Sequence, residues 1–437
     1  MKTLFISSKI KPHSPKLGGV LAWFIWFISV AFVDFQFFLQ ISSGVMVDKL
    51  MTSFSMSAFG AGILASIYYY IYVLLQTPAG ALMDRFGPRF LLTVGGFVCT
   101  FGCFLFGFAK MLWIAQVGRL FMGAGSAFAF VGSMYLVREW FPKNRFAFMV
   151  GVTETLGLIT TIFGMIFMAV LIHQFGWRVF MWGSGILGLV LSFACWKYIK
   201  DKPTQTNDQI YEPSDHIPFK KRIMTILRTP LSWFNGIYCG LMFGIISVFG
   251  SLWSIPFIIE TTHCSLTVAT AATTMILVGA AIATPIIGYI TGNYGKRRLI
   301  LVSFGLLSTL VFMIILLVPL SIVSLFILLF LLGIGCSSYA LNFAIAEEIA
   351  PSYAKSTSIG FTNALCVISA PLFQPLVGFL LESSSKSNGI HLAEYQIALS
   401  ILPIMTLIAA WIATKLPEKG WIAKNENEFD SDSVLES

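Results

Sequence analysis

Long uninterrupted apolar runs are the feature that most constrains how this chain can fold. Windowed hydropathy identifies twelve runs, each close to the roughly 20 residues that a helix needs to cross a bilayer. We expect spans at residues 17–44, 57–80, 90–109, 111–138, 146–172, 178–198, 230–258, 265–290, 299–318, 322–346, 356–381 and 396–415. Only 11% of the 437 residues are charged, against about 25% in a soluble domain. The sequence predicts an all-α, multi-pass membrane protein.

The same runs argue against other classes of protein. A transmembrane β-barrel would show alternating segments of about ten residues. The net charge of +8 comes from Lys and Arg in short loops rather than on one face, so we expect no nucleic-acid partner. The seven cysteines show no metal-ligand spacing, so neither zinc nor disulfides are expected. No GxSxG or HExxH motif points to an enzyme, and the few buried acids form no channel-like ring.

One long polar connection divides the spans six and six. It occupies residues 199–229, so we expect bundles at residues 17–198 and 230–415, with polar ends at 1–16 and 416–437. The first run is too long for a signal peptide and is interpreted as a retained span.

Charge asymmetry between the loops sets the expected orientation. Placing the N-terminus in the cytoplasm leaves few basic residues in the loops on the other side, namely Lys49, Lys110, Arg178 and Lys386. By the positive-inside rule, both termini are then cytoplasmic. This orientation agrees with an even number of spans.

An internal repeat relates the two halves, at an offset of about 210 residues. The matching positions are Gly80 and Gly288, Gly87 and Gly295, Arg89 and Arg297, Gly123 and Gly333, Gly125 and Gly335, Glu139 and Glu348, Pro142 and Pro351, Gly151 and Gly360, and Glu154 and Asn363. Two parallel repeats predict a substrate site between the halves, near the membrane midplane.

Four motifs resemble signatures of the major facilitator superfamily, across nearly the whole chain. They are Gly80-x-x-x-Asp84-Arg85-x-Gly87-x-Arg89, Arg119-x-x-x-Gly123-x-Gly125, Glu139-Trp-Phe-Pro142-x-x-Arg145 and Gly176-Trp-Arg178-x-x-Phe180. The resemblance implies a major-facilitator fold of twelve transmembrane helices in two pseudo-symmetric six-helix bundles. It also implies a monomer that needs no cofactor.

Two further similarities narrow the expectation. The family's antiporter motif in span 5 ends in Gly-Pro, whereas the run Gly157 to Gly164 lacks that proline, which weakens an antiporter interpretation. Residues 38–46 and 68–80 resemble a branch of bacterial phagosomal nutrient transporters and lysosomal relatives. That resemblance implies amino-acid-like or peptide-like solutes.

The turn after span 2 is the predicted gate. Its glycines, Gly80 and Gly87, allow close helix approach, and Asp84 can meet the positive N-terminal end of a neighbouring helix. The expected partner is Ser356, at the start of span 11 on the same side. The resemblance implies that this contact latches the cytoplasmic gate in the outward-facing state. The alternative is that Arg85 and Arg89 act only as topology determinants.

Three ionisable residues within the spans are candidates for proton coupling. Counting from the cytoplasmic ends, Asp34 and Arg119 fall at matching depth, so we hypothesise a pair in which Asp34 takes up a proton and Arg119 senses its charge. A permanent structural ion pair is the alternative. Glu154 is a second proton site or a substrate ligand, unless it only hydrogen-bonds neighbouring backbone.

Polar groups in otherwise apolar spans are candidate substrate ligands, although each alone is as well explained by an interhelical hydrogen bond. They are Gln36, Gln40, Gln76, Asn235, Tyr238, Tyr339, Asn342, Asn363 and Gln374. We expect Pro256 to break span 7 near an outer gate. The tyrosines from Tyr68 to Tyr72 are either a wall of the cavity or packing near the outer interface, and the second is slightly favoured.

These features together predict a carrier in the bacterial inner membrane that works by alternating access. Its partners are the lipid bilayer and a small polar metabolite, amino-acid-like or a short peptide. We expect import driven by the proton gradient. The alternative is a uniporter, or an exporter of small organic solutes or a siderophore.

Overall fold

The computed structural model describes residues 17–203, 217–384 and 392–418, and these residues contain helices but no strand. The N-terminal bundle consists of α1 (Val20–Phe54), α2 (Ala58–Phe86), α3 (Pro88–Gly107), α4 (Leu112–Ser126), α5 (Ala129–Trp140), the short η1 (Lys143–Arg145) and α6 (Phe146–Tyr198). The predicted polar ends at 1–16 and beyond Glu418 lie outside the described residues.

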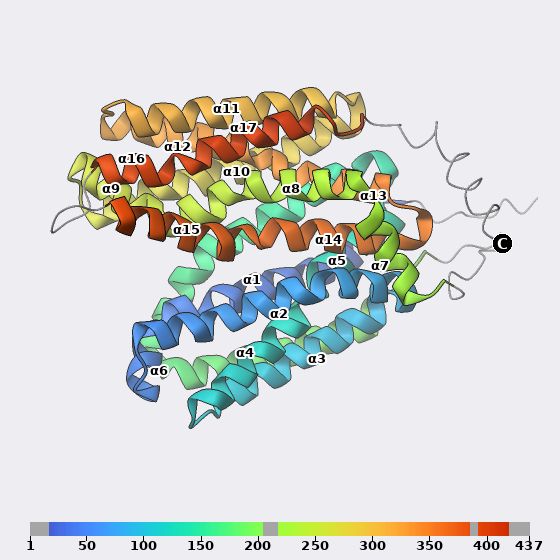
Figure 1. Cartoon of the computed structure of the whole chain (residues 1–437). Coiled ribbons are helices and arrows are strands. Elements are labelled where there is room, and N and C mark those ends of the chain that lie inside the picture. Colours follow the sequence, from blue (N-terminus) through green and yellow to red (C-terminus); the bar gives the residue numbers. More distant parts are fainter. Residues whose placement is uncertain (1–16, 204–216, 385–391, 419–437) are drawn as a thin grey trace, which may run out of the picture.

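The C-terminal bundle follows after α7 (Phe219–Arg228). It consists of α8 (Pro230–Gly244), η3 (Ile245–Trp253), α9 (Ser254–Thr262), α10 (Leu266–Tyr294), α11 (Arg297–Leu317), α12 (Ile322–Cys336), η4 (Ser337–Ala340), α13 (Leu341–Ile349), η5 (Ser352–Ala354), α14 (Lys355–Val367), α15 (Ser369–Ser384), α16 (Leu392–Leu399) and α17 (Ile401–Ala413). Figure 1 shows the two bundles side by side, with the helices of each running roughly parallel or antiparallel.

Eleven helical segments among the described residues are long and apolar enough to cross a membrane. One of them contains α6, in which Gly176 has φ 82° and ψ 158°. Before Gly176, α6 contacts α1 through Gly157 and Phe37, and after it Gly188 returns alongside Thr100 of α3. Each arm exceeds about 20 residues, so α6 supplies two spans and the predicted twelve are present.

The two ends of the bundles are distinct. At one end lie α7 and the turn between α2 and α3, and we call it the linker end; α9 and α16 lie at the opposite, far end (Figure 1). The helix α7 falls within 199–229, which the sequence predicted as a polar connection only. It packs on the C-terminal bundle, because Ile226 is buried against Ala354 and Phe361, and Arg222 donates a hydrogen bond to the carbonyl of Tyr353.

Two predicted boundaries differ from the structure. The first span continues beyond Gly44 to Phe54, because α1 stays helical through the polar residues that hydropathy treats as a loop. Pro256 does not break its span: the helical segment runs without interruption from Pro230 to Thr262. The irregularity lies upstream instead, in the π-helical η3, where backbone hydrogen bonds span five residues rather than the four of an α-helix.

The bundles meet along two seams that the internal repeat relates. In the first, between α2 and α14, a β-carbon on Gly80 would overlap the carbonyl of Ser356, and one on Gly360 would overlap that of Gln76. In the second, between α10 and α6, Gly288 and Gly151 make the equivalent contacts with backbone. Both seams therefore bring helix backbones together near the linker end.

Substituting Gly176 tests the reversal within α6. Its φ and ψ lie in a region that only glycine adopts readily, so Gly176→Ala should lower the free energy of unfolding by about 1–3 kcal/mol. Gly183→Ala is the matched control, because Gly183 is helical with open space around its Cα and should be neutral or stabilising. The melting temperatures of the two purified variants compare them, and equal values would contradict the strained turn.

Candidate functional site

One stripe of α2 carries the residues that connect the bundles. Tyr68, Tyr72, Gln76, Gly80 and Asp84 recur every four residues, which places them on one face of the helix. This face packs against α14, and four of its positions contact residues across the seam or in the interior. The stripe runs from the linker end into the middle of the protein.

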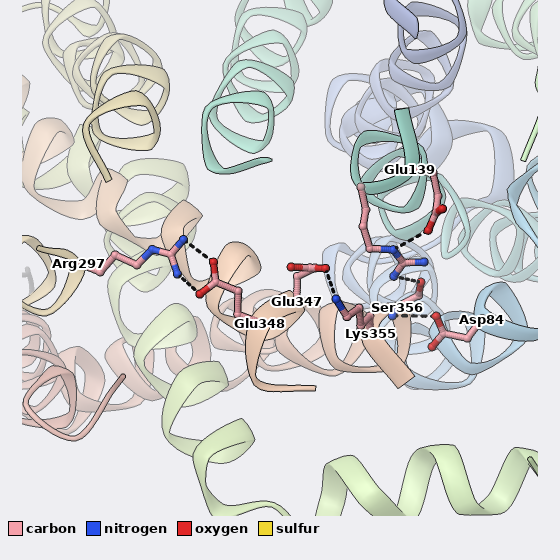
Figure 2. A network of polar contacts seen from close by, with 8 residues as sticks. Asp84, Glu139, Arg297, Glu347, Glu348, Lys355 and Ser356 are labelled. Carbon is pink, nitrogen blue, oxygen red and sulfur yellow. Dashed lines mark hydrogen bonds and ion pairs between the residues drawn. The ribbon is translucent and has the colours of Figure 1, made fainter. Parts of the chain in front are cut away.

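At the linker end, Asp84 caps α14 across the seam. Its Oδ1 accepts a hydrogen bond from the backbone N–H of Ser356 at 3.0 Å (Figure 2). Its Oδ2 accepts from the backbone N–H of Thr357 at 2.9 Å and from the hydroxyl of Thr357 at 2.8 Å. The carboxylate therefore satisfies two orphan donors at the positive end of the helix dipole. The contact that the sequence predicted between Asp84 and the start of span 11 is present.

Arg138 joins this contact, and the sequence did not single it out. Its Nε pairs with Glu139 at 3.1 Å, its Nη1 donates to the hydroxyl of Ser356 at 3.4 Å, and its guanidinium lies 4.4 Å from the ring of Tyr135. The sequence signal that could have identified Arg138 is its position directly before Glu139, the first residue of one of the four motifs.

Two ion pairs within the C-terminal bundle brace the same region. Arg297 forms a bidentate pair with Glu348, at 2.6 and 2.8 Å, and Lys355 pairs with Glu347 at 2.7 Å (Figure 2). Such forked geometry fixes the relative orientation of the two groups. The pairs hold α11, α13 and the start of α14 as one unit, which presents Ser356 to Asp84.

The remaining residues of the predicted gate bind within the N-terminal bundle. Arg85 is exposed, with its guanidinium 5.0 Å from the ring of Phe86. Gly87 has φ 76°, which permits the turn into α3. The backbone N–H of Arg89 donates to Asp201 at 2.7 Å, and its Nε donates to the carbonyl of Trp196 at 2.9 Å. Burial raises the pKa of Asp201, and this hydrogen bond from Arg89 opposes that rise.

The pairing of Asp34 with Arg119 is wrong. Arg119 donates to the carbonyl of Leu39 at 2.8 Å and to the hydroxyl of Ser42 at 3.4 Å, and its guanidinium lies 4.7 Å from the ring of Tyr68. Leu39 is five residues beyond Asp34, or about 7.5 Å along the helix. Counting residues gave similar depths, but it did not give the direction in which each side chain points.

Asp34 lies between α1 and the first arm of α6. Its Oδ1 is buried without a hydrogen-bond partner. A buried acceptor without a donor is costly for an ionised group and less so for a protonated one. Asp34 therefore remains a candidate proton site, although no Lys or Arg among the described residues forms an ion pair with it.

Among the hydrogen bonds that join the bundles in the interior, two connect a tyrosine of one bundle to Glu154 or Asn363 of the other. The hydroxyl of Tyr339, in η4, donates to Oε2 of Glu154 at 2.8 Å, and Nδ2 of Asn363 donates to the hydroxyl of Tyr72 at 3.1 Å. Glu154 and Asn363 are equivalent positions of the repeat, and each binds a tyrosine of the opposite bundle. Glu154 thus binds a side chain across the interface rather than neighbouring backbone.

The sequence slightly favoured packing of the tyrosine cluster near the outer interface, and this prediction is wrong for Tyr68 and Tyr72. Tyr68 and Tyr72 are buried and stacked, with ring centroids 6.0 Å apart and planes inclined by 11°. The hydroxyl of Tyr68 donates to the carbonyl of Gln36 at 3.1 Å. The two rings therefore form an interior wall between Arg119 and Asn363.

Several other candidate ligands are engaged inside the C-terminal bundle. Asn342 donates to Oδ1 of Asn235 at 2.9 Å, and Asn235 donates in return to the carbonyl of Asn342. Tyr238 donates to the carbonyl of Leu301 at 2.9 Å. Gln374 donates to the carbonyl of Ser247 at 2.7 Å. These bonds match the interhelical alternative, so we leave the four side chains out of the proposed site.

Three glutamines remain beside the tyrosine wall. Gln36 donates to Oε1 of Gln40 at 2.9 Å, within α1. Gln76 is fully buried one turn along α2 from Tyr72, and its Oε1 has no hydrogen-bond partner. Together with Arg119, Glu154, Tyr339 and Asn363, they make up the candidate site.

Two six-helix bundles related by a repeat, with buried polar groups at their interface, are the architecture of a secondary transporter. The chain belongs to the Major Facilitator Superfamily, whose family model matches residues 17–372 and 239–431. It is therefore a multi-pass membrane carrier rather than an enzyme, and carriers of this superfamily work without a cofactor.

Individual relatives are distant. The chain is 27% identical to the uncharacterized transporter YybO of Bacillus subtilis (strain 168) over 45% of its own length and 44% of that protein. It is 29% identical to the probable galactarate/D-glucarate transporter GarP of Escherichia coli (strain K12), over 34% of its length and 35% of GarP. Both matches thus span less than half of the relative.

A solved structure supports the fold over a greater length. The transporter FucP in the outward conformation superposes with a TM-score of 0.68, at 15% sequence identity, over 89% of this chain and 99% of FucP. At this identity the likeness concerns the fold alone.

Replacing the capping carboxylate tests the contact between the bundles. In Asp84→Asn, one acceptor oxygen becomes a donor facing the N–H groups of Ser356 and Thr357, so the linker end should open more often. Cysteines at Asn144 and Asn293, whose side chains are hydrogen-bonded across the bundles at 3.4 Å, report closure by crosslinking. The yield should fall at least threefold.

Arg85→Gln is the control for this experiment, because Arg85 lies beside Asp84 but is exposed. It should leave the crosslinking yield at the wild-type level. An unchanged yield in Asp84→Asn would mean that the glycine contacts alone close the linker end.

Proposed function

We propose that this carrier imports a small polar solute bearing a carboxylate, amino-acid-like or a short peptide, together with protons. The observation that carries the proposal is the buried hydrogen bond from Tyr339 to Glu154, an acid of one bundle held by a hydroxyl of the other. Arg119 supports the choice of a carboxylate, because it is a buried cation without an acidic partner among the described residues. The name of GarP, a probable galactarate/D-glucarate transporter, also denotes a carboxylate solute.

The geometry of the seams supports an outward-facing state. Hydrogen bonds between the bundles among the described residues involve the linker half, for example at Asp84, Thr155 and Glu154. With the linker end in the cytoplasm, as the positive-inside rule favours, the site would be closed on the inside. We accordingly place both termini in the cytoplasm and the protein in a bacterial inner membrane, as a monomer of two bundles at residues 17–198 and 230–415.

Protonation of Glu154 provides a route to coupling. As a carboxylate it accepts a charge-assisted hydrogen bond from Tyr339, which is about twice as strong as a neutral one. A proton on Glu154 removes that charge and weakens the bond between α6 and η4. The linker end then opens more readily, so proton entry from outside precedes release of solute and proton inside. Asp34 is a second candidate for carrying a proton.

Replacing Glu154 separates coupling from transport. Glu154→Gln keeps an acceptor for Tyr339 but no titrating group, so accumulation driven by a pH gradient should fall to simple equilibration. Counterflow exchange should stay within about threefold of wild type, because exchange needs no net proton movement. Reconstituted proteoliposomes measure both quantities for the same solute.

Asp48→Asn is the matched control, because Asp48 is an exposed acid of α1 towards the far end, and it should retain accumulation. Asp34→Asn tests the second proton candidate in the same assay. If Glu154→Gln and Asp34→Asn both accumulate solute as wild type does, proton coupling through these acids is excluded.

A thermal-shift screen of the purified protein identifies the solute class. A ligand that binds only the folded state raises its stability by RT ln(1 + [L]/Kd). Carboxylates should stabilise the wild type, and Arg119→Lys should weaken their binding at least tenfold, since an ammonium lacks the planar fork of a guanidinium. Stabilisation by bulky hydrophobic or chelating compounds instead would favour the exporter or siderophore alternative.

A further inference from the structure

The candidate site has a cation at one end that no acid neutralises. Arg119 is 1% exposed, and its Nε has no hydrogen-bond partner. Ion pairs among the described residues involve Arg138, Arg297 and Lys355, but not Arg119. A buried guanidinium with spare donor capacity is suited to one anionic group of a solute.

The other end of the site carries the opposite charge. Glu154 is 7% exposed and accepts its hydrogen bond from the neutral hydroxyl of Tyr339, and no Lys or Arg within the described ranges pairs with it. Gln76 adds a neutral amide, whose buried Oε1 and Nε2 both lack a hydrogen-bond partner. The only charge at this end is therefore the negative charge of Glu154.

Two stacked tyrosines connect the ends. The guanidinium of Arg119 lies 4.7 Å from the ring of Tyr68, and that ring lies 6.0 Å from the ring of Tyr72. Tyr72 in turn accepts a hydrogen bond from Asn363, the repeat counterpart of Glu154. The two rings thus lead from the cation to the interface between the bundles, where Glu154 also lies, so one elongated solute can face both groups.

We propose that the site selects solutes with a carboxylate at one end and a neutral or cationic group at the other, and that Glu154 excludes dicarboxylates. This inference rests on the proposed function, in which Arg119 binds the carboxylate. The body of the solute lies along Tyr68 and Tyr72, and its distal group faces Glu154 and Gln76. A distal hydroxyl or ammonium donates hydrogen bonds there.

A second carboxylate meets a different environment at the distal end. It would face the charge of Glu154 in a site of low effective dielectric, where like charges repel strongly and a single neutral amide does not offset the repulsion. The selectivity of this chain would therefore differ from that of GarP, whose name denotes two sugar diacids, galactarate and D-glucarate. The difference would lie in charge rather than in size.

Two series of six-carbon probes test this selectivity, and the members of each series share the same carbon chain. The first is gluconate, 6-amino-6-deoxygluconate and glucarate, and the second is 6-hydroxyhexanoate, 6-aminohexanoate and adipate. Within each series, only the group at the sixth carbon changes, from hydroxyl to ammonium to carboxylate. Kd is measured by thermal shift on the purified full chain, for wild type, Glu154→Gln, Arg119→Gln and the control Asp48→Asn.

In the series that binds, we expect the hydroxyl and ammonium acids to bind wild type at least tenfold more tightly than the diacid. Glu154→Gln should bring the diacid within about threefold of the hydroxyl acid, and it should remove any advantage of the ammonium acid. Asp48→Asn should keep the wild-type order. The melting temperature without ligand establishes that each variant is folded.

Three outcomes would overturn the proposal. A diacid that binds wild type as tightly as the hydroxyl acid contradicts the selectivity directly. A ratio unchanged in Glu154→Gln contradicts the assignment to that residue while leaving the carboxylate site intact. Absence of binding by every probe, or full binding in Arg119→Gln, instead contradicts the carboxylate site of the proposed function, and the selectivity falls with it.

Discussion

The close approach of α2 to α14 is the constraint on which the linker end depends. Because Gly80 and Gly360 lack side chains, the two backbones touch, and Asp84 then comes within hydrogen-bonding distance of the first N–H groups of α14. The same spacing sets the register deeper in the protein, where Tyr72 meets Asn363. A larger residue at either glycine would displace both contacts together. The gate and the site are therefore linked through one helix rather than through a separate element.

The second seam has the same glycines but a different chemistry. Gly292 stands at the repeat position of Asp84, and a β-carbon there would overlap the carbonyl of Asn144. The hydrogen bonds of this seam are neutral, such as that from Thr155 to the carbonyl of Ala281 at 2.6 Å. Charge therefore contributes to closing the seam between α2 and α14, whereas the seam between α6 and α10 is closed by shape and neutral hydrogen bonds. A rocking motion about the interface would meet unequal resistance on its two sides.

The sequence predicted correctly those features that depend only on position along a helix. Apolar length fixed the spans, and the chemistry of a helix N-terminus identified the partner of Asp84. It failed where the azimuth of a side chain mattered. Depth along the membrane suggested a pair of Asp34 and Arg119, although Arg119 points to the carbonyl of Leu39. Polarity likewise could not tell Asn235, which binds Asn342 inside one bundle, from Asn363, which binds across the interface. Side-chain direction depends on how helices rotate against each other, and no residue pattern along one helix records that.

Two of the places where the repeat exchanges an acid for a neutral residue are contacts between the bundles. Asp84 corresponds to Gly292, and Glu154 corresponds to Asn363, which makes the equivalent bond to a tyrosine without a charge. A symmetric carrier needs neither difference in order to alternate between two states. Coupling to a proton does need a group whose change of charge alters the interface. One such group is enough. A second acid in place of Asn363 would weaken the contact with Tyr72 at the same moment as the first weakens the contact with Tyr339. The divergence of the repeat at these positions is therefore what a one-sided proton switch on an otherwise symmetric scaffold requires.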